Sequence, residues 1–133
     1  MSGLVLKLAP NERILINGAV IENGDRRARI AVRSPNANIL RLRDAIHPGD
    51  ATTPVSRACY ETQLILSGDR PAEEGRLVLL TGIEKLTLVF DDRDSRRLLT
   101  NATAGVLEGN YYRCLRALRD LLPREARLMA VRS

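Results

Sequence analysis

Arginine is the residue type whose abundance and spacing could do chemistry in this chain. The 133 residues carry 21 Lys and Arg against 16 Asp and Glu, for a net charge of +5, and Lys7 and Lys85 are the only lysines. A guanidinium group presents a planar fork of donors that suits phosphate oxygens and base edges, whereas lysine is a point charge. The bias toward arginine is compatible with RNA binding, and equally with the codon usage of a GC-rich genome.

The arginines between positions 26 and 43 alternate with apolar residues, and no acidic residue lies among them. Because successive side chains of a strand point to opposite faces, Arg27, Arg29 and Arg33 should share one face of a strand. Arg41 and Arg43 should share one face of the next strand for the same reason. If the two strands pair through the connection at 34–38, five arginines lie on one solvent-facing surface of the sheet.

Five like charges on one sheet face repel one another, so this surface is suited to bind an anion. Three interpretations are open: a solvated face in an arginine-rich protein, a surface that binds RNA phosphates, and a surface that binds an acidic protein. The chain has no aromatic platform of the kind on which RNA-recognition sheets stack bases. The RNA interpretation assigns these candidate residues: Arg26, Arg27, Arg29, Arg33, Arg41 and Arg43 for phosphates, and Asn23 and Asn36 for base edges.

Other residue types give no sign of catalysis or of a metal site. His47, the single histidine, lies in a loop, and Cys59 and Cys114 lack the spacing of a zinc or redox motif. The sequence has no glycine-rich loop of the type that cradles a nucleotide phosphate. The acidic residues at 91, 92 and 94 are better explained by a helix start than by magnesium. We therefore expect no enzyme activity, no cofactor and no metal, and two buried reduced thiols.

The basic residues must be positioned by an N-terminal region of short strands. Apolar alternation predicts strands at 4–8, 13–16, 19–22, 26–32 and 39–43. Asn17-Gly18 and Asn23-Gly24 are strong signals for two-residue hairpins, because type I′ turns need positive φ at both positions. Residues 1–44 are thus predicted to form an antiparallel β-meander. Residues 45–54, which include two prolines, form the connecting loop.

The rest of the chain, residues 55–133, is predicted to be helical, which gives an α+β fold. Apolar periodicity indicates helices over 55–66, 73–90, 91–107 and 110–122, and Pro123 should end the last one. The segment 64–66 could instead be a strand. The segment 104–123 resembles one tetratricopeptide unit, and a lone unit must pack against neighbouring helices or against a partner.

The last predicted helix carries a second basic set opposite its apolar face. The candidate residues for protein binding there are Arg113, Arg116 and Arg119. The chain shows no signal peptide and no apolar stretch of the roughly 18 residues that a membrane span requires, so we expect a cytoplasmic protein without a membrane partner. A small sheet with open edges often forms a homo-oligomer, although the sequence does not select an edge.

Several segments, in order and at fitting spacing, resemble the FlbT family of flagellum biosynthesis regulators. They are Leu6-Lys7-Leu8, Asn17-Gly18-Ala19-Val20, Asn23-Gly24-Asp25-Arg26-Arg27, Thr52-Thr53-Pro54, and the stretch from Tyr111-Tyr112 to Pro123-Arg124-Glu125-Ala126. The resemblance implies a post-transcriptional regulator that binds the 5′ untranslated region of flagellin mRNA and represses its translation or promotes its decay. In some relatives the effect on flagellin is positive.

The resemblance also implies partners, which are the flagellin mRNA leader and either flagellin or another flagellar regulator. An alternative function of a different class is a protein-binding adaptor or chaperone in flagellin export and flagellum assembly. The tetratricopeptide-like segment and the basic face of the last helix favour that alternative. No site residues are carried over from the family, so the candidate residues depend on the strand and helix patterns alone.

Overall fold

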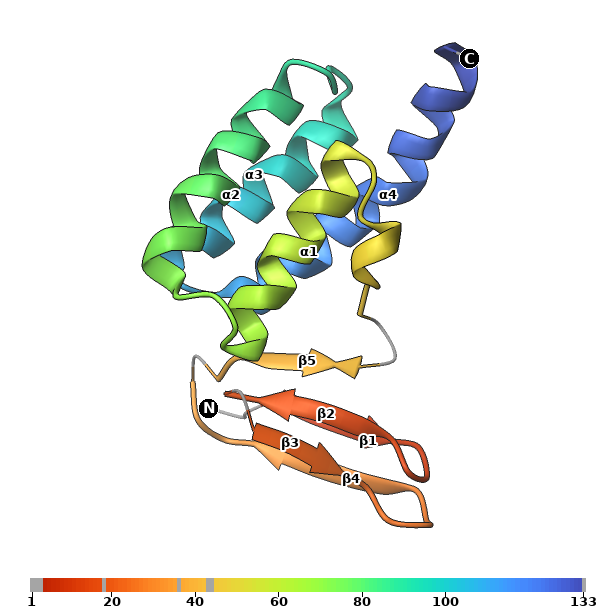
Figure 1. Cartoon of the computed structure of the whole chain (residues 1–133), viewed down its shortest axis with the longest axis vertical. Coiled ribbons are helices and arrows are strands. Elements are labelled where there is room, and N and C mark those ends of the chain that lie inside the picture. Colours follow the sequence, from red (N-terminus) through yellow and green to blue (C-terminus); the bar gives the residue numbers. More distant parts are fainter. Residues whose placement is uncertain (1–3, 18, 36, 43–44, 133) are drawn as a thin grey trace.

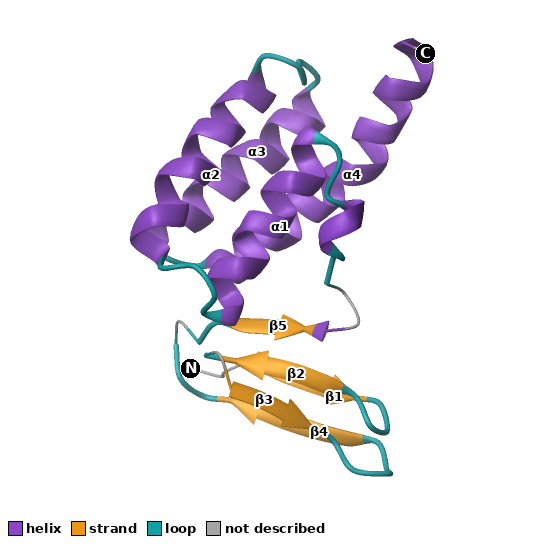
Figure 2. Cartoon of the chain, in the orientation of Figure 1, coloured by secondary structure: helices purple, strands orange, loops and turns teal. Residues whose placement is uncertain are grey.

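The protein has the predicted α+β fold, in which strands precede helices. The computed structural model describes residues 4–17, 19–35, 37–42 and 45–132. Its strands are β1 (Leu4–Leu8), β2 (Arg13–Ile16), β3 (Ala19–Glu22), β4 (Ala28–Val32) and β5 (Ile39–Arg41). Its helices are α1 (Pro54–Ser67), α2 (Ala72–Thr87), α3 (Arg93–Glu108) and α4 (Tyr111–Arg132). Figures 1 and 2 show the helices at one end of the molecule and the strands at the other.

The strands form two antiparallel sheets instead of one continuous meander. β1 pairs with β4, and β2 lies between β3 and β5. The predicted hairpin at Asn17 is confirmed, because Asn17 has a φ of 51° and β2 pairs with β3 directly across this turn. The predicted hairpin at Asn23-Gly24 is wrong. Neither residue has the positive φ that a type I′ turn needs, and β3 does not pair with β4.

The segment at Asn23 packs instead against the turn between β1 and β2. The Asn23 N–H donates to the Glu12 carbonyl at 2.8 Å, and the Asn23 side-chain amide donates to the Ala9 carbonyl at 2.8 Å. The Asn11 N–H donates to the Gly24 carbonyl at 2.8 Å. These bonds direct the chain away from the sheet of β3 and across to the second sheet, where β4 pairs with β1.

The two sheets pack face to face on a small apolar core. Its buried members are Leu6, Leu8, Ile14 and Ile39, and Tyr112 of α4 packs against them. The opposite face of the three-stranded sheet contributes Leu15 and Leu40 to a larger core that the helices share. Figure 1 shows β5 next to α1, between the helices and the other strands. Alternation along β2 thus serves both cores, since consecutive side chains point to opposite faces.

Local sequence signals begin and end α1. Thr53 and Ser56 form a capping box, in which each side chain accepts a hydrogen bond from the backbone N–H of the other residue. Pro54 occupies the first helical position, where a missing N–H is not needed. Gly68 ends the helix in the left-handed region with a φ of 86°. The segment 64–66 is therefore helical and not a strand.

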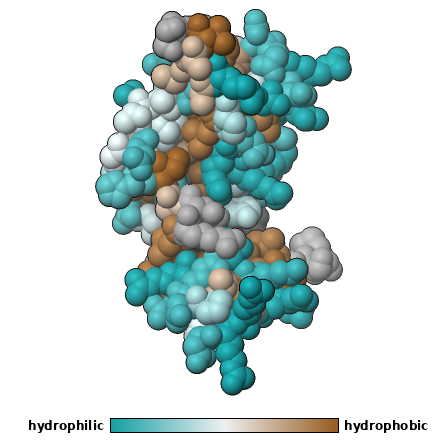
Figure 3. Space-filling view, turned by 90° about the vertical axis from the view of Figure 1, so that its right-hand side faces the viewer, coloured by the Kyte–Doolittle hydropathy of each residue, from teal (hydrophilic) through white to brown (hydrophobic). Residues whose placement is uncertain are grey.

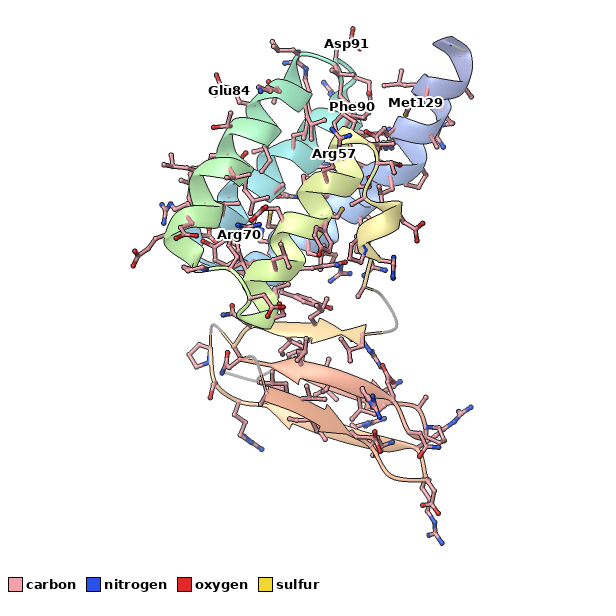
Figure 4. The ribbon with its side chains drawn as sticks, viewed as in Figure 1. Arg57, Arg70, Glu84, Phe90, Asp91 and Met129 are labelled. Atoms are coloured by element: carbon pink, nitrogen blue, oxygen red, sulfur yellow. The ribbon has the colours of Figure 1, made fainter. Side chains whose placement is uncertain are left out.

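The second helix is shorter than the predicted span of 73–90. It ends at Thr87, and the N–H groups of Val89 and Phe90 both donate to the Leu86 carbonyl at 3.0 Å. Phe90 is buried in the helical core, and Figure 4 labels it beside Asp91 at the far end of the bundle. The chain turns here because burial of the aromatic ring is favoured over another turn of helix.

The connecting segment 45–54 is anchored to α1. The Ile46 N–H donates to Gln63 Oε1 at 2.6 Å, and Gln63 Nε2 donates to the Ile46 carbonyl at 3.1 Å. The segment contains a short 3-10 turn, η2 (Pro48–Asp50), where the exposed His47 side chain accepts from the Gly49 N–H at 3.1 Å. This segment therefore fixes the strand region to the helices, and His47 serves as a local cap.

Helix α4 runs through Pro123 to Arg132, so the prediction that Pro123 ends the helix is wrong. An interior proline costs a helix about 3 kcal/mol, and contacts beyond it offset that cost. Glu125 is buried and accepts from the Val55 N–H at 2.9 Å and from the Thr53 hydroxyl at 2.5 Å, at the N-terminus of α1. A carboxylate is favoured there by the positive end of the helix dipole.

The helical core contains both cysteines as buried free thiols, as predicted. Cys114 Sγ lies 3.9 Å from the Thr62 hydroxyl. α3 and α4 approach closely at Gly105, where an added Cβ would lie 2.8 Å from the Asn110 carbonyl oxygen. Within the described part of the chain, no helix combines the length and the apolar character needed to cross a membrane.

The Glu125 cap should make a measurable contribution to stability. Glu125→Ala removes the acceptor of the Val55 N–H and the Thr53 hydroxyl, so we expect the free energy of unfolding to fall by about 1–3 kcal/mol. Urea unfolding followed by far-UV circular dichroism measures this change. Glu84→Ala, at an exposed position on α2, is the control and should change stability by less than about 0.5 kcal/mol. Equal effects of the two substitutions would contradict the capping role.

The two thiols should be unreactive in the folded protein. Burial raises the pKa of Cys59 and of Cys114 to about 12, so both remain neutral at neutral pH. We expect no modification by iodoacetamide in native buffer and modification of both thiols in denaturant, as measured by intact mass. Because the unfolded thiols ionise near 9.0 and the folded ones only near 12, stability should fall as pH rises through this interval. Rapid labelling of the native protein would contradict this assignment.

Candidate nucleic-acid interface

Lys7 and Arg29 project side by side from the outer face of the β1–β4 sheet. They are directly opposite in the register of the antiparallel pair, and both are exposed. Opposite residues of neighbouring strands point to the same face with Cβ atoms about 4.5–5.5 Å apart. The inward positions beside them, Leu6 and Ile30, pack in the sandwich core. The cross-strand pair therefore holds two cations close together on the surface.

An open groove of about 700 Å³ lies beside this pair. The charged residues that line it are Lys7, Arg27, Arg29 and Arg41, and none of the described lining residues is acidic. Figure 3 shows hydrophilic side chains over much of one face of the strand region, and Figure 4 shows nitrogen-tipped side chains that project from the end remote from the helices. A groove whose charges have one sign focuses the field and attracts anions.

Arg41 lines the groove but is already paired with a carboxylate. Its guanidinium forms a bidentate ion pair with Glu12, with Nε–Oε2 at 2.7 Å and Nη2–Oε1 at 2.8 Å, and it also donates to the Lys7 carbonyl. The side chains of Arg41 and Glu12 are only 15% and 5% exposed. This largely buried ion pair therefore has a structural role. Because β5 pairs with β2 and not with β4, the prediction of one continuous surface of five arginines is wrong.

The other predicted RNA-binding residues lie outside the groove lining. Arg26 and Arg33 are exposed near the two ends of β4. Both amide hydrogens of Asn23 are used, since Nδ2 donates to two backbone carbonyls at 2.8 Å, so its amide supports the loop and does not face solvent as a free donor. Asn36 and Arg43 lie outside the described residues. Of the predicted set, the structure thus brings together Arg27, Arg29 and Arg41.

Lys7 is the groove residue that the sequence analysis missed. Its position between two buried leucines already places it on the solvent face of a strand. Alternation alone, however, does not identify the neighbouring strand. β1 and β4 pair although β2 and β3 lie between them in sequence, so only the fold brings Lys7 next to Arg29.

The second predicted basic set, on α4, is divided by the structure. Arg113 forms an ion pair with Glu108 at 3.0 Å and donates to the Asn101 side chain at 3.1 Å, so it supports the α3–α4 connection. Arg116 is exposed and Arg119 is half-buried, and both line an open groove of about 630 Å³ along α4. The apolar residues of that lining are Tyr112, Leu115, Leu122 and Pro123.

Neither acidic nor sulfur-bearing side chains form a site in the described structure. Within the described residues, no group of three His, Cys, Asp or Glu side chains is arranged to hold a metal ion. Asp92 is the N-cap of α3, and its side chain accepts from the Ser95 N–H at 3.0 Å. This backbone hydrogen bond, assisted by the positive charge of Arg124, lowers the pKa of Asp92. The acidic cluster therefore starts a helix, as the sequence analysis proposed.

Comparisons with known proteins agree with one another. The family model described as "Flagellar protein FlbT" matches residues 4–129. The chain is similar to the probable flagellum biosynthesis repressor protein FlbT 1 of Bradyrhizobium diazoefficiens, with 32% identity over 94% of this chain and 84% of the relative. It is 34% identical to the probable flagellum biosynthesis repressor protein FlbT of Rhodopseudomonas palustris, over 96% of this chain and 98% of the relative. It is 28% identical to the flagellum biosynthesis repressor protein FlbT of Caulobacter vibrioides, over 92% of this chain and 86% of the relative. No solved structure gives a significant match.

The burial of the Glu12–Arg41 pair predicts a large effect on stability. Glu12→Ala leaves a largely buried guanidinium without its carboxylate, so we expect a loss of about 3 kcal/mol in the free energy of unfolding. Glu22→Ala is a matched control, because the Arg13–Glu22 pair has the same 2.7 Å distance but side chains that are 62% and 53% exposed. The control should lose less than about 1 kcal/mol. Chemical denaturation measures both, and similar losses would contradict the structural role of Glu12.

Proposed function

The chain belongs to the FlbT family of flagellar proteins, and on this premise we propose that it represses flagellin expression by binding the 5′ untranslated region of flagellin mRNA. The groove beside the β1–β4 sheet is the proposed contact surface. Lys7, Arg27 and Arg29, which line it and have no ion pair among the described residues, would hold phosphates of the RNA backbone. The sign of regulation is taken from relatives whose names describe them as repressors.

The observation that carries this proposal is the cross-strand pair of Lys7 and Arg29. Like charges in directly opposite positions destabilise a sheet, and no carboxylate is among the described residues that line the groove beside them. An RNA phosphate placed between the two cations would remove the repulsion and release counterions. Arg41 contributes differently, because its pairing with Glu12 fixes the edge of the groove.

The contact proposed here is mainly to the RNA backbone. The described lining of the groove contains no aromatic residue, and Tyr111 and Phe90 are buried in the helical core. Base stacking of the usual kind is therefore not available in the groove. Phosphate contacts position a nucleic acid without reading its sequence. Selectivity for the leader would then come from its shape or from a further partner, and the protein would act by binding, without catalysis.

A protein-binding adaptor in flagellin export or flagellum assembly is the second candidate function. The observation that favours it is the groove along α4, whose lining combines Arg116 and Arg119 with Asp120 and four apolar or aromatic residues. Two cations against one carboxylate beside apolar side chains suit an amphipathic segment with acidic residues. Pull-downs from cell extract with and without ribonuclease separate the two functions, because protein partners that survive the nuclease favour the adaptor.

Removal of Lys7, Arg27 and Arg29 from the groove should abolish most RNA binding. We expect the triple variant Lys7→Ala, Arg27→Ala, Arg29→Ala to bind the flagellin leader at least about 10-fold more weakly in a gel-shift titration, since three phosphate contacts are lost. The wild-type protein should show a log–log dependence of affinity on salt with a slope near −2, or about −0.7 for each of three phosphates. The variant should show a slope close to zero.

A second triple variant controls for the loss of net charge. Lys85→Ala, Arg76→Ala, Arg93→Ala also removes one lysine and two arginines, all exposed on the helices, and should leave the affinity for RNA nearly unchanged. Equal weakening by both variants would mean that net charge, and not the groove, holds the RNA. Absence of RNA binding by the wild-type protein would refute the proposed function.

A further inference from the structure

We propose that two copies of this chain associate through the end of the β-sandwich remote from the helices, with β3 of each copy paired with β4 of the other. Two five-stranded sheets would result, each in the order β1-β4-β3-β2-β5, where the first two strands come from one copy and the last three from its partner. The inference goes beyond the proposed function and does not depend on RNA binding.

Two open strand edges lie on the same side of the molecule. Among the described residues, β3 pairs with β2 alone and β4 pairs with β1 alone, and all four residues of β3 are exposed. The other two edges, those of β5 and β1, each have a contact within the described residues. α1 packs beside β5, and the Arg41 guanidinium donates a hydrogen bond to the Lys7 carbonyl of β1. Figure 1 shows β3 and β4 as the strands farthest from the helices.

The core of the sandwich is open between these two edges. Ile14 and Ile21 are opposite in the β2–β3 register and point to the same face, yet Ile14 is 0% exposed and Ile21 is 39% exposed. Ile30 of β4 points into the same core and is only half-buried. Tyr112 of α4 packs against the same core. A second copy on the open side would bury apolar side chains that the single chain leaves in water.

The backbone of β3 has hydrogen-bonding groups ready for a partner strand. The Asn23 N–H donates to the Glu12 carbonyl, next in register to the Arg13–Glu22 pair. Because hydrogen-bonded and non-hydrogen-bonded pairs alternate along an antiparallel ladder, Ile21 and Ala19 should be the β3 residues that bond to β2. The N–H and C=O groups of Val20 and Glu22 therefore point away from β2. No described hydrogen bond satisfies them, and unpaired groups of this kind are a template for strand addition.

Charge selects β4 of the second copy as the partner of β3. Three arginines, Arg27, Arg29 and Arg33, lie on or next to β4, whereas β3 carries no basic residue and its one acidic residue, Glu22, is paired with Arg13 of β2. Pairing of β4 with β4 would oppose arginines across the interface, which is unfavourable. Pairing of β3 with β4 places a strand without basic residues beside the basic one and keeps the two basic strands apart.

Strand direction permits this arrangement. β3 and β4 run in opposite directions in Figure 1 and lie in the two stacked sheets. A two-fold axis parallel to the strands preserves each strand's direction and exchanges the two sheets. It therefore places β3 of the partner antiparallel to β4, as a ladder requires. The open edges of β3 and β4 in both copies are then paired, and no edge is left to add a third copy, as in most homodimers.

The oligomeric state tests the association. Because the edges are short, we expect a roughly micromolar dissociation constant, and sedimentation velocity should show a concentration-dependent species of twice the 14.8 kDa chain mass. Ile21→Glu and Val20→Pro should each give a monomer with an unchanged far-UV circular dichroism spectrum. The proline removes only an N–H that points away from β2. A wild-type protein that remains monomeric at high concentration would overturn the proposal.

A matched control shows whether any added charge has the same effect. Leu77 on α2 is 70% exposed, and Leu77→Glu should leave the dimer intact. If Leu77→Glu dissociates the dimer as strongly as Ile21→Glu, the strand interface is wrong. If either edge variant remains fully dimeric while folded, the interface lies elsewhere and the proposal also fails.

Cross-linking distinguishes the two pairings. A chain with Val20→Cys is mixed with a chain with Ala31→Cys and treated with a short bismaleimide; Cys59 and Cys114 are buried and should not react. The proposal predicts a covalent product that joins the two different chains through positions 20 and 31. Products that join two copies of the same variant in preference to the mixed pair would overturn the β3–β4 arrangement.

Discussion

A buried ion pair at the junction of the two sheets holds the strand region together. The Glu12 carboxylate lies in the turn between β1 and β2, where it receives the Arg41 guanidinium from β5 and the Ala9 N–H. The Glu12 carbonyl receives the Asn23 N–H and so fixes the path from β3 to β4. A carboxylate buried to this extent is tolerated only when it is paired and hydrogen-bonded. The pairing of β1 with β4 therefore depends on contacts centred on this residue.

The same pair divides the basic residues into two kinds. Arg41 is bound within the fold, whereas Lys7, Arg27 and Arg29 line the same groove and have no described ion pair. Surface cations without carboxylate partners give long-range attraction for anions that falls with salt. The helical region shows the same division, since Arg113 supports the α3–α4 connection and Arg116 faces an open groove. Local contacts, and not abundance, decide which arginines are available to a ligand.

Short-range sequence patterns were sufficient to predict those features that depend only on residues close together in the sequence. The presence of five strands, the Asn17 turn and the start of α1 were predicted correctly because each depends on neighbouring residues. Two strands are shorter than predicted, since β4 begins at Ala28 and not at 26, and β5 ends at Arg41 and not at 43. The prediction of a hairpin at Asn23 was wrong because the Asn23 side-chain amide bonds to the turn between β1 and β2. No short-range sequence pattern encodes that contact.

The missed and misplaced features of the site have the same cause. Lys7 was overlooked because strand alternation gives the face of a side chain but not its neighbouring strand. Pro123 appeared to end a helix because the offsetting contact, between Glu125 and Val55, joins residues 70 positions apart. The sequence therefore predicted the type of each element and most solvent-facing basic residues, while long-range pairing decided which of them meet.

The Glu125 contact has a consequence for the order in which the protein assembles during synthesis. The ribosome releases α1 long before α4, so the first N–H groups of α1 lack their acceptor while the intervening helices are made. Contacts of such high sequence separation form late and slow the overall reaction. The nascent chain thus presents an unfinished bundle together with the open edge of β3, and the apolar surface of both stays exposed until the final helix docks.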